Sequence, residues 1–190
     1  MATTPIIDPR RGRNRFRPLI WGAAAVLLLL PAVAMQVTSE VNWTGSDFAV
    51  MGIMLATVCG LYELAVWLSG NTAYRAAFGI AVFTGFVTVW VNLAVGMLGS
   101  ENNIENLMFA GVLLIAAVGA LVAKFRSRGM ALAMDAAALA QLIVCVIALM
   151  IGFRERGVFF AACFAVPWFI SAQLFRKAAR DEAATSARRL

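Results

Sequence analysis

The sequence predicts an all-α integral membrane protein, a six-transmembrane-helix bundle with up-down antiparallel topology. Of its 190 residues, 62% are hydrophobic and 14% are charged, and the mean hydropathy is +0.84. Soluble domains are about 45–50% apolar and about 25% charged, so one soluble core could not bury this much apolar surface. The apolar residues also fall into six stretches that short polar breaks separate, which makes consecutive helices antiparallel.

A helix needs about 20 mainly apolar residues to cross about 30 Å of hydrocarbon. Six stretches meet this requirement, over residues 18–37, 48–69, 76–98, 107–124, 130–152 and 157–175. The expected domains are therefore a basic, disordered cytoplasmic N-terminus (1–17), a six-helix transmembrane domain (18–175) and a basic cytoplasmic tail (176–190) that continues the sixth helix.

The first three spans are bounded by changes in composition. The first follows five arginines and contains Pro31, and the second begins after the polar segment 38–47. Residues 69–75, which include the turn-forming pair Gly70 and Asn71, separate the second span from the third.

The last three spans follow breaks at residues 99–106, 126–129 and 154–157. Small residues recur on the fourth and fifth spans and predict faces where two helix backbones pack closely. These residues are Gly111, Ala116, Gly119 and Ala123 on the fourth span and Ala133, Ala136, Ala137 and Ala140 on the fifth. Pro167 lies midway along the sixth span and should kink it.

The distribution of Lys and Arg predicts the orientation. Fourteen of the sixteen lie on the side that holds both termini, and only Arg154 and Arg156 lie on the other. Cytoplasmic segments carry the excess of Lys and Arg, so both termini are expected in the cytoplasm. The opposite side carries five carboxylates and a formal charge of −3.

The N-terminal region allows a second interpretation. A basic segment, an apolar run and Ala32-Val33-Ala34 resemble a signal peptide with its cleavage site, so residues 1–34 are either the first span or a cleaved leader. The length of the apolar run and Pro31 favour the span. Cleavage would leave five spans and an N-terminus outside.

The sequence pI is about 10.0, and the basic residues flank the spans. This placement is typical of topology determinants, so the expected partners are anionic lipid headgroups at the cytoplasmic face and no nucleic acid.

The two long outer loops share residues at a constant offset of 61, which predicts a parallel repeat of helical hairpins. The matching pairs are Ser39 with Ser100, Glu40 with Glu101, Asn42 with Asn103, Phe48 with Phe109, and Ala49 with Ala110. The shared need for polar residues before a new span explains the same pattern without a repeat.

Glu63 and Asp135 are the carboxylates inside the predicted spans, and both lie in the cytoplasmic third. Ionisable groups in hydrocarbon cost several kcal/mol, so the two form a candidate site that binds a cation or relays protons. The alternative, which we favour, is that each is neutralised by a cation of the inner side. The cations considered are Arg75, Lys124, Arg126 and Arg128.

Gln141 and Asn92 complete the candidate intramembrane polar site, although hydrogen bonding between helices is their ordinary role. A second candidate is an outer acidic cluster whose oxygen ligands would suit Ca²⁺ or Mg²⁺; solvated loops with salt bridges are the simpler interpretation. The cluster consists of Glu40, Asp47, Glu101, Asn103 and Glu105.

The sequence offers no catalytic residue, no cofactor site and no definite metal site. It has no histidine, and its three cysteines fall in apolar runs without a CxxC pair. It also lacks P-loop, GxGxxG, HExxH and GxSxG motifs.

Several segments resemble a family of uncharacterised small bacterial inner-membrane proteins. They are Glu40–Trp43, Ser46–Phe48, Leu61–Leu64, Asn92–Gly96 and Gly99–Glu101, within roughly residues 36–150. No activity is assigned to that family, so the resemblance implies a bacterial inner-membrane location and no catalytic residue.

These observations favour a non-enzymatic membrane protein that associates with itself or is an accessory subunit of a larger membrane complex. The alternative is a small oligomeric transporter or channel for a cation or small solute that uses Glu63 and Asp135.

Overall fold

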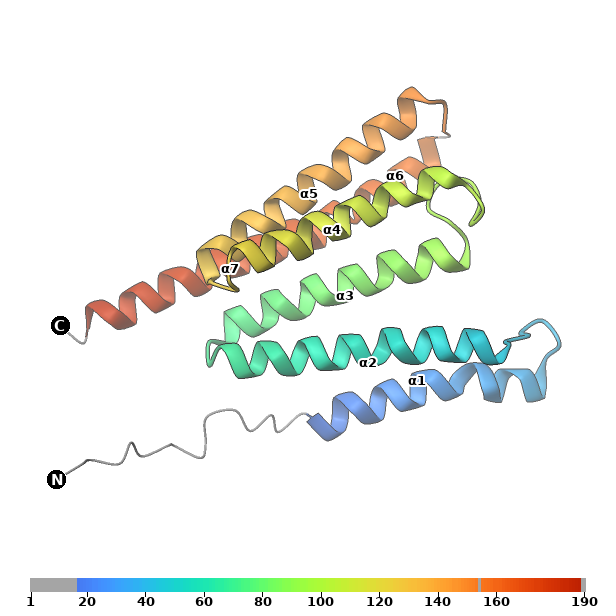
Figure 1. Ribbon diagram of the computed structural model, residues 1–190, viewed down its shortest axis with the longest axis horizontal. Helices are drawn as coiled ribbons and strands as arrows, with labels where there is room; N and C mark the ends of the chain where they lie inside the picture. Colours follow the sequence, from blue (N-terminus) through green and yellow to red (C-terminus); the bar gives the residue numbers. More distant parts are fainter. Residues whose placement is uncertain (1–16, 154, 189–190) are drawn as a thin grey trace. The chain divides into compact units, whose positions relative to one another are not determined.

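The computed structural model describes residues 17–153 and 155–188, and every regular element in these ranges is a helix (Figure 1). The expectations for residues 1–16, and for Arg154 in the third outer loop, lie outside the described residues. The helices are α1 (Arg17–Val37), α2 (Gly45–Leu68), α3 (Thr72–Ala94), the short 3₁₀ helix η1 (Ile104–Asn106), α4 (Leu107–Val122), α5 (Ser127–Met150), α6 (Glu155–Cys163) and α7 (Ala165–Ala187).

Six helical segments of the described residues are long and apolar enough to cross a membrane, which confirms the predicted all-α fold. The sixth comprises α6 and α7 and continues to Ala187, as expected for the tail. The second and third begin three and four residues before their predicted starts because polar caps extend them. Thr44 and Asp47 form a capping box on α2, and the Asn71 side chain accepts a hydrogen bond from the Ala73 amide at 2.8 Å.

The chain divides into two compact units, residues 1–70 and 71–190. In the first unit α1 and α2 form an antiparallel hairpin, since Arg17 at the start of α1 lies against Glu63 near the end of α2. No residue of α1 is buried, although the helix is strongly apolar. Within this unit α2 therefore covers α1 only in part.

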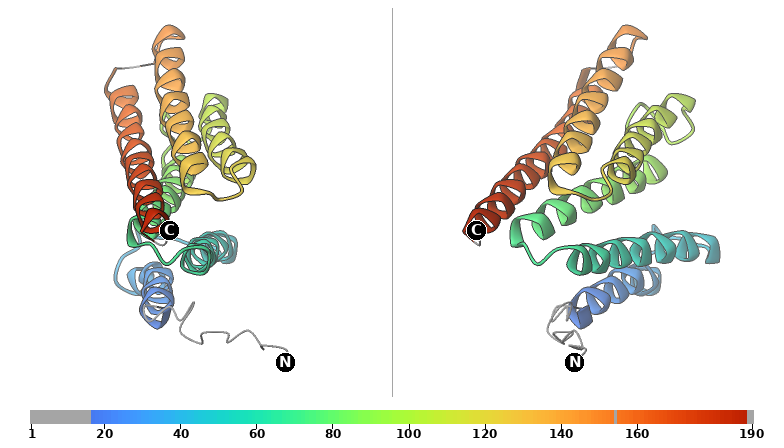
Figure 2. Two further views of the ribbon diagram at one scale, coloured as in Figure 1. Left: turned by 90° about the vertical axis from the view of Figure 1, so that its left-hand side faces the viewer. Right: turned by 60° about the vertical axis from the view of Figure 1, so that its left-hand side comes forward.

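In the second unit α7 packs against both α3 and α5, and α5 also packs against α4 (Figure 2). Two hydrogen bonds fix the antiparallel register of α7. Ser171 Oγ donates to the Ala77 carbonyl at 2.8 Å, and Ser127 Oγ donates to Glu182 Oε1 at 2.6 Å. Phe175 and Ala172 of α7 are fully buried at this contact, so α7 forms the centre of the unit.

The predicted small-residue faces meet between α4 and α5. A Cβ added to Gly119 would lie 2.7 Å from Ala133 Cβ, so the two backbones approach more closely than larger residues allow. Ala116, Ala133 and Ala137 are buried as expected. Ala136 is exposed and Gly111 faces open space, so these two do not belong to the packed faces.

The sixth span is interrupted at Phe164, between α6 and α7, three residues before Pro167. A proline has no N–H, and its ring clashes with the carbonyl four residues earlier, which here belongs to Cys163. The Phe164 amide instead donates to the Ala161 carbonyl at 3.1 Å, a 3₁₀-type bond. The helix is therefore interrupted for one residue near Pro167, and Phe164 keeps a helical backbone conformation (φ −67°, ψ −16°). A kink of the helix axis stays a prediction.

Candidate functional site

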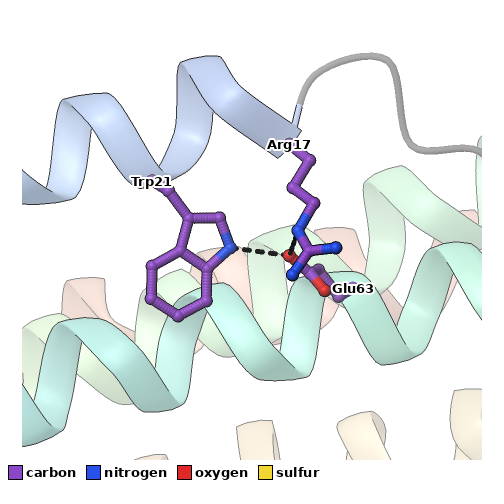
Figure 3. A network of polar contacts seen from close by, with 3 residues as sticks. All are labelled: Arg17, Trp21 and Glu63. Atoms are coloured by element: carbon purple, nitrogen blue, oxygen red, sulfur yellow. Dashed lines mark hydrogen bonds and ion pairs between the residues drawn. The ribbon is translucent and has the colours of Figure 1, made fainter.

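Glu63 is held by two side chains of α1 (Figure 3). Trp21 Nε1 donates to Glu63 Oε1 at 2.6 Å, and Arg17 Nε lies 3.0 Å from the same oxygen. Arg17 and Trp21 are four residues apart and therefore share one face of α1. The carboxylate is 31% exposed, so it is partly shielded and its charge is balanced within the hairpin.

Asp135 of α5 is paired with Arg176 of α7, whose Nη2 donates to Asp135 Oδ2. Both side chains are half-buried, with 27% of Asp135 and 39% of Arg176 exposed. The direct charge-assisted hydrogen bond offsets the free energy that partial removal from water costs the two charges.

Glu63 and Asp135 lie in different units, and each is paired with an arginine of its own unit. The sequence allowed either a site for a cation or proton, or neutralisation of each carboxylate by a nearby cation. These pairs correspond to the second interpretation. The neutralising cations differ from those expected, because Arg17 and Arg176 take this role in place of the four inner-side cations considered.

Gln141 is completely buried and lies at the break between α6 and α7. Its Nε2 donates to the Ala161 carbonyl at 2.8 Å, while its Oε1 has no hydrogen-bond partner in the described residues. Ala161 is one of the residues whose helical hydrogen bonding the break alters. Gln141 therefore joins α5 to the last turn of α6, directly before the break.

Asn92 belongs to a row of polar side chains along α3. Thr84, Thr88 and Asn92 occur at intervals of four residues, and each donates to the backbone carbonyl four residues earlier. The two threonines are buried, and Asn92 Oδ1 is buried without a partner among the described residues. The donors of all three side chains are therefore hydrogen-bonded within α3 itself, as is usual for polar residues with a structural role.

In the first outer loop Asp47 acts as a helix cap. Its Oδ2 accepts a hydrogen bond from the Thr44 amide at 2.7 Å and another from Thr44 Oγ1 at 2.8 Å. Negative charge at a helix N-terminus is also favoured by the helix dipole. Glu40 is exposed on the same loop.

In the second outer loop the asparagines hold the backbone. Asn103 Nδ2 donates to the Leu98 carbonyl at 2.6 Å, and Asn106 accepts from the Leu98 amide at 2.9 Å and donates to the Ser100 carbonyl at 2.7 Å. Glu101 is exposed and Glu105 half-buried. Within the described ranges no three His, Cys, Asp or Glu side chains gather closely enough to hold a metal ion.

The two outer loops differ in how they start the next helix. A capping box starts α2, whereas η1 leads into α4 and the residue before α4, Asn106, makes no side-chain cap. The similarity at offset 61 does not extend to these caps, and a parallel repeat remains a prediction.

Sequence reasoning missed Asn106, Thr84 and Thr88 because it ranked polar residues by charge and depth and not by their position in a helix or loop. Thr84, Thr88 and Asn92 are spaced by four residues, and this spacing could have shown that they share one face of α3. Comparison of this chain with protein-family models, curated proteins and solved structures gave no match.

Proposed function

We propose that this integral membrane protein is non-enzymatic and acts by association, either with further copies of itself or as an accessory subunit of a larger membrane complex. The observation that carries this proposal is the pairing of both carboxylates of the predicted spans. Glu63 and Asp135 are each neutralised by an arginine, so neither is poised to bind a cation. Association does not require a free ionisable group within the spans.

An exposed surface of α2 could form the contact with another helix. Ala56 and Gly60 are exposed, and a Cβ added to Gly60 would have no atom within 4 Å. Small residues four positions apart let two helices in a membrane approach closely. Large apolar side chains flank this pair, including Ile53, which is 68% exposed.

The location and orientation belong to the same proposal. The resemblance noted above supports a bacterial inner membrane, and the excess of Lys and Arg on one side supports cytoplasmic termini. Reporter proteins fused to Leu190 and within residues 99–103 test this orientation. A reporter active in the cytoplasm at the terminus and outside at the loop supports it, and the reverse contradicts it.

The test of association is the mass of the full-length chain in mild detergent, measured by light scattering, and energy transfer between labelled copies in vesicles. We expect an oligomer that Gly60→Leu or Ala56→Leu dissociates. Gly22→Leu is the matched control, because Gly22 of α1 is also exposed with no atom within 4 Å of an added Cβ. A monomer in both measurements that also co-purifies with no other membrane protein contradicts the proposal.

A transporter or channel is the second candidate. The observation that favours it is the buried, unpartnered Oδ1 of Asn92, at the end of the polar row on α3. Ion and solute flux into proteoliposomes tests it with the double variant Glu63→Gln/Asp135→Asn. Flux that the double variant abolishes favours this candidate, whereas vesicles without flux, or flux that it leaves unchanged, exclude a role for the two carboxylates.

A further inference from the structure

An open groove of about 520 Å³ lies between the start of α5 and the second half of α7. Arg128 of α5 and Arg176 and Arg180 of α7 line it. Residues 176 and 180 are four apart, so they share one face of α7, and residue 128 lies in the first turn of α5. Three guanidinium groups from two antiparallel helices thus border one depression.

The rest of the groove is apolar and mostly small. Ala131 and Leu132 come from α5, and Ala179 and Ala183 come from α7. The alanines leave space between the helices that longer side chains would fill. The lining therefore combines a cationic border with an apolar floor.

The charge of this border is only partly compensated. Asp135 pairs with Arg176, but the side chains of Arg128 and Arg180 make no hydrogen bond or ion pair with other described residues. The neighbouring acid Glu182 accepts a hydrogen bond from Ser127 Oγ. Counting Asp135 and Glu182, the three guanidinium groups leave the region of the groove with one net positive charge.

The groove also lies at the edge of the apolar spans. Residue 128 is in the first turn of α5, and residue 176 is the first after the apolar stretch that ends at Phe175. Phospholipid phosphates lie at this level, next to the hydrocarbon core. The groove lies at this level whichever side of the membrane it faces.

We infer that this groove binds the phosphate of an anionic phospholipid, with the glycerol against its apolar floor. Guanidinium groups form paired hydrogen bonds with phosphate oxygens, and the Asp135 contact holds one of them in place. Basic residues between helices at the membrane surface are a recognised setting for acidic lipids. The inference does not depend on self-association.

Native mass spectrometry of the full-length chain tests this site, with equal amounts of phosphatidylglycerol and phosphatidylcholine added to the detergent. We expect one retained phosphatidylglycerol per chain. The double variant Arg128→Gln/Arg180→Gln should weaken its binding by at least about tenfold. Ala183→Leu should also weaken it, because the larger side chain fills the floor without changing the charge.

The matched control is Arg126→Gln/Lys177→Gln, which removes the same charge from the same region but outside the groove lining. It should change binding by less than about threefold. Equal losses in both double variants, or no effect of Ala183→Leu, would show unspecific surface attraction and overturn the proposal. Displacement of the lipid by inorganic phosphate or glycerol phosphate at similar concentrations would assign the site to a soluble anion and overturn it too.

Discussion

Arg176 of α7 donates a hydrogen bond to Asp135 of α5 and so joins two helices at positions 41 residues apart in the sequence. The same two helices are linked two turns further along by Ser127 and Glu182. Both contacts lie where the apolar part of α7 ends, and together they fix the register between α5 and the extension of α7.

Loss of either member of the Asp135–Arg176 pair should destabilise the second unit. Because both side chains are partly exposed, we expect about 1–2 kcal/mol for Asp135→Asn or Arg176→Gln in the free energy of unfolding. The double variant should cost less than the sum of the two. Unfolding in detergent mixtures measures this; strictly additive costs would show that the pair does not interact.

The contacts of Glu63 predict a graded series. Glu63→Gln keeps an oxygen that accepts from Trp21 Nε1 but removes the ion pair with Arg17, whereas Glu63→Leu removes both. We expect a cost below about 1 kcal/mol for the first variant, because Arg17 is mostly exposed, and about 0.6 kcal/mol more for the second.

Trp21→Phe is the complementary change, since it keeps an aromatic side chain but loses the indole N–H together with the rest of the five-membered ring. Its effect on unfolding should be smaller in the Glu63→Leu background, where only the loss of ring area remains. An effect of equal size in both backgrounds would mean that the hydrogen bond contributes nothing.

The spans were predictable because their cause is local: apolar stretches of membrane length, interrupted by polar and turn-forming residues. The partners of Glu63 and Asp135 were not. Arg176 meets Asp135 only because α5 and α7 pack in one particular antiparallel register, and nothing within either helix specifies that register. Sequence reasoning chose cations in or next to the adjoining loops, whereas the actual partners come from other helices, Arg17 from the start of α1 and Arg176 from the middle of α7.

The helix starts illustrate an intermediate case. Thr44 and Asn71 are typical N-cap residues a few positions before apolar runs, so the earlier starts of α2 and α3 could have been predicted from residue type. Hydropathy alone placed the two starts after the last charged residue, Asp47 or Arg75, three or four positions too late.

The contact between Gly119 and Ala133 predicts a size limit. Gly119→Ala places a Cβ 2.7 Å from Ala133 Cβ and should destabilise the α4–α5 contact by about 1–3 kcal/mol. Exchanging the two residues, as Gly119→Ala/Ala133→Gly, should restore most of the loss. Gly111→Ala is the control on the same helix, because an added Cβ there meets no atom within 4 Å. Equal effects of the two single glycine variants would contradict this packing.

Pro167 and Gln141 should act together at the break in the sixth span. Pro167→Ala supplies an N–H that donates to the Cys163 carbonyl, so the helix can continue from α6 into α7 and amide exchange around Phe164 should slow. In the native chain Gln141→Leu removes the hydrogen bond to the Ala161 carbonyl and should cost about 0.6–1.7 kcal/mol. In the Pro167→Ala background Ala161 becomes an ordinary helical acceptor, so the same substitution should cost less. Hydrogen exchange and unfolding of the native chain, the two single variants and the double variant measure this coupling. A cost of Gln141→Leu that Pro167→Ala leaves unchanged would show that the hydrogen bond of Gln141 is not coupled to the break.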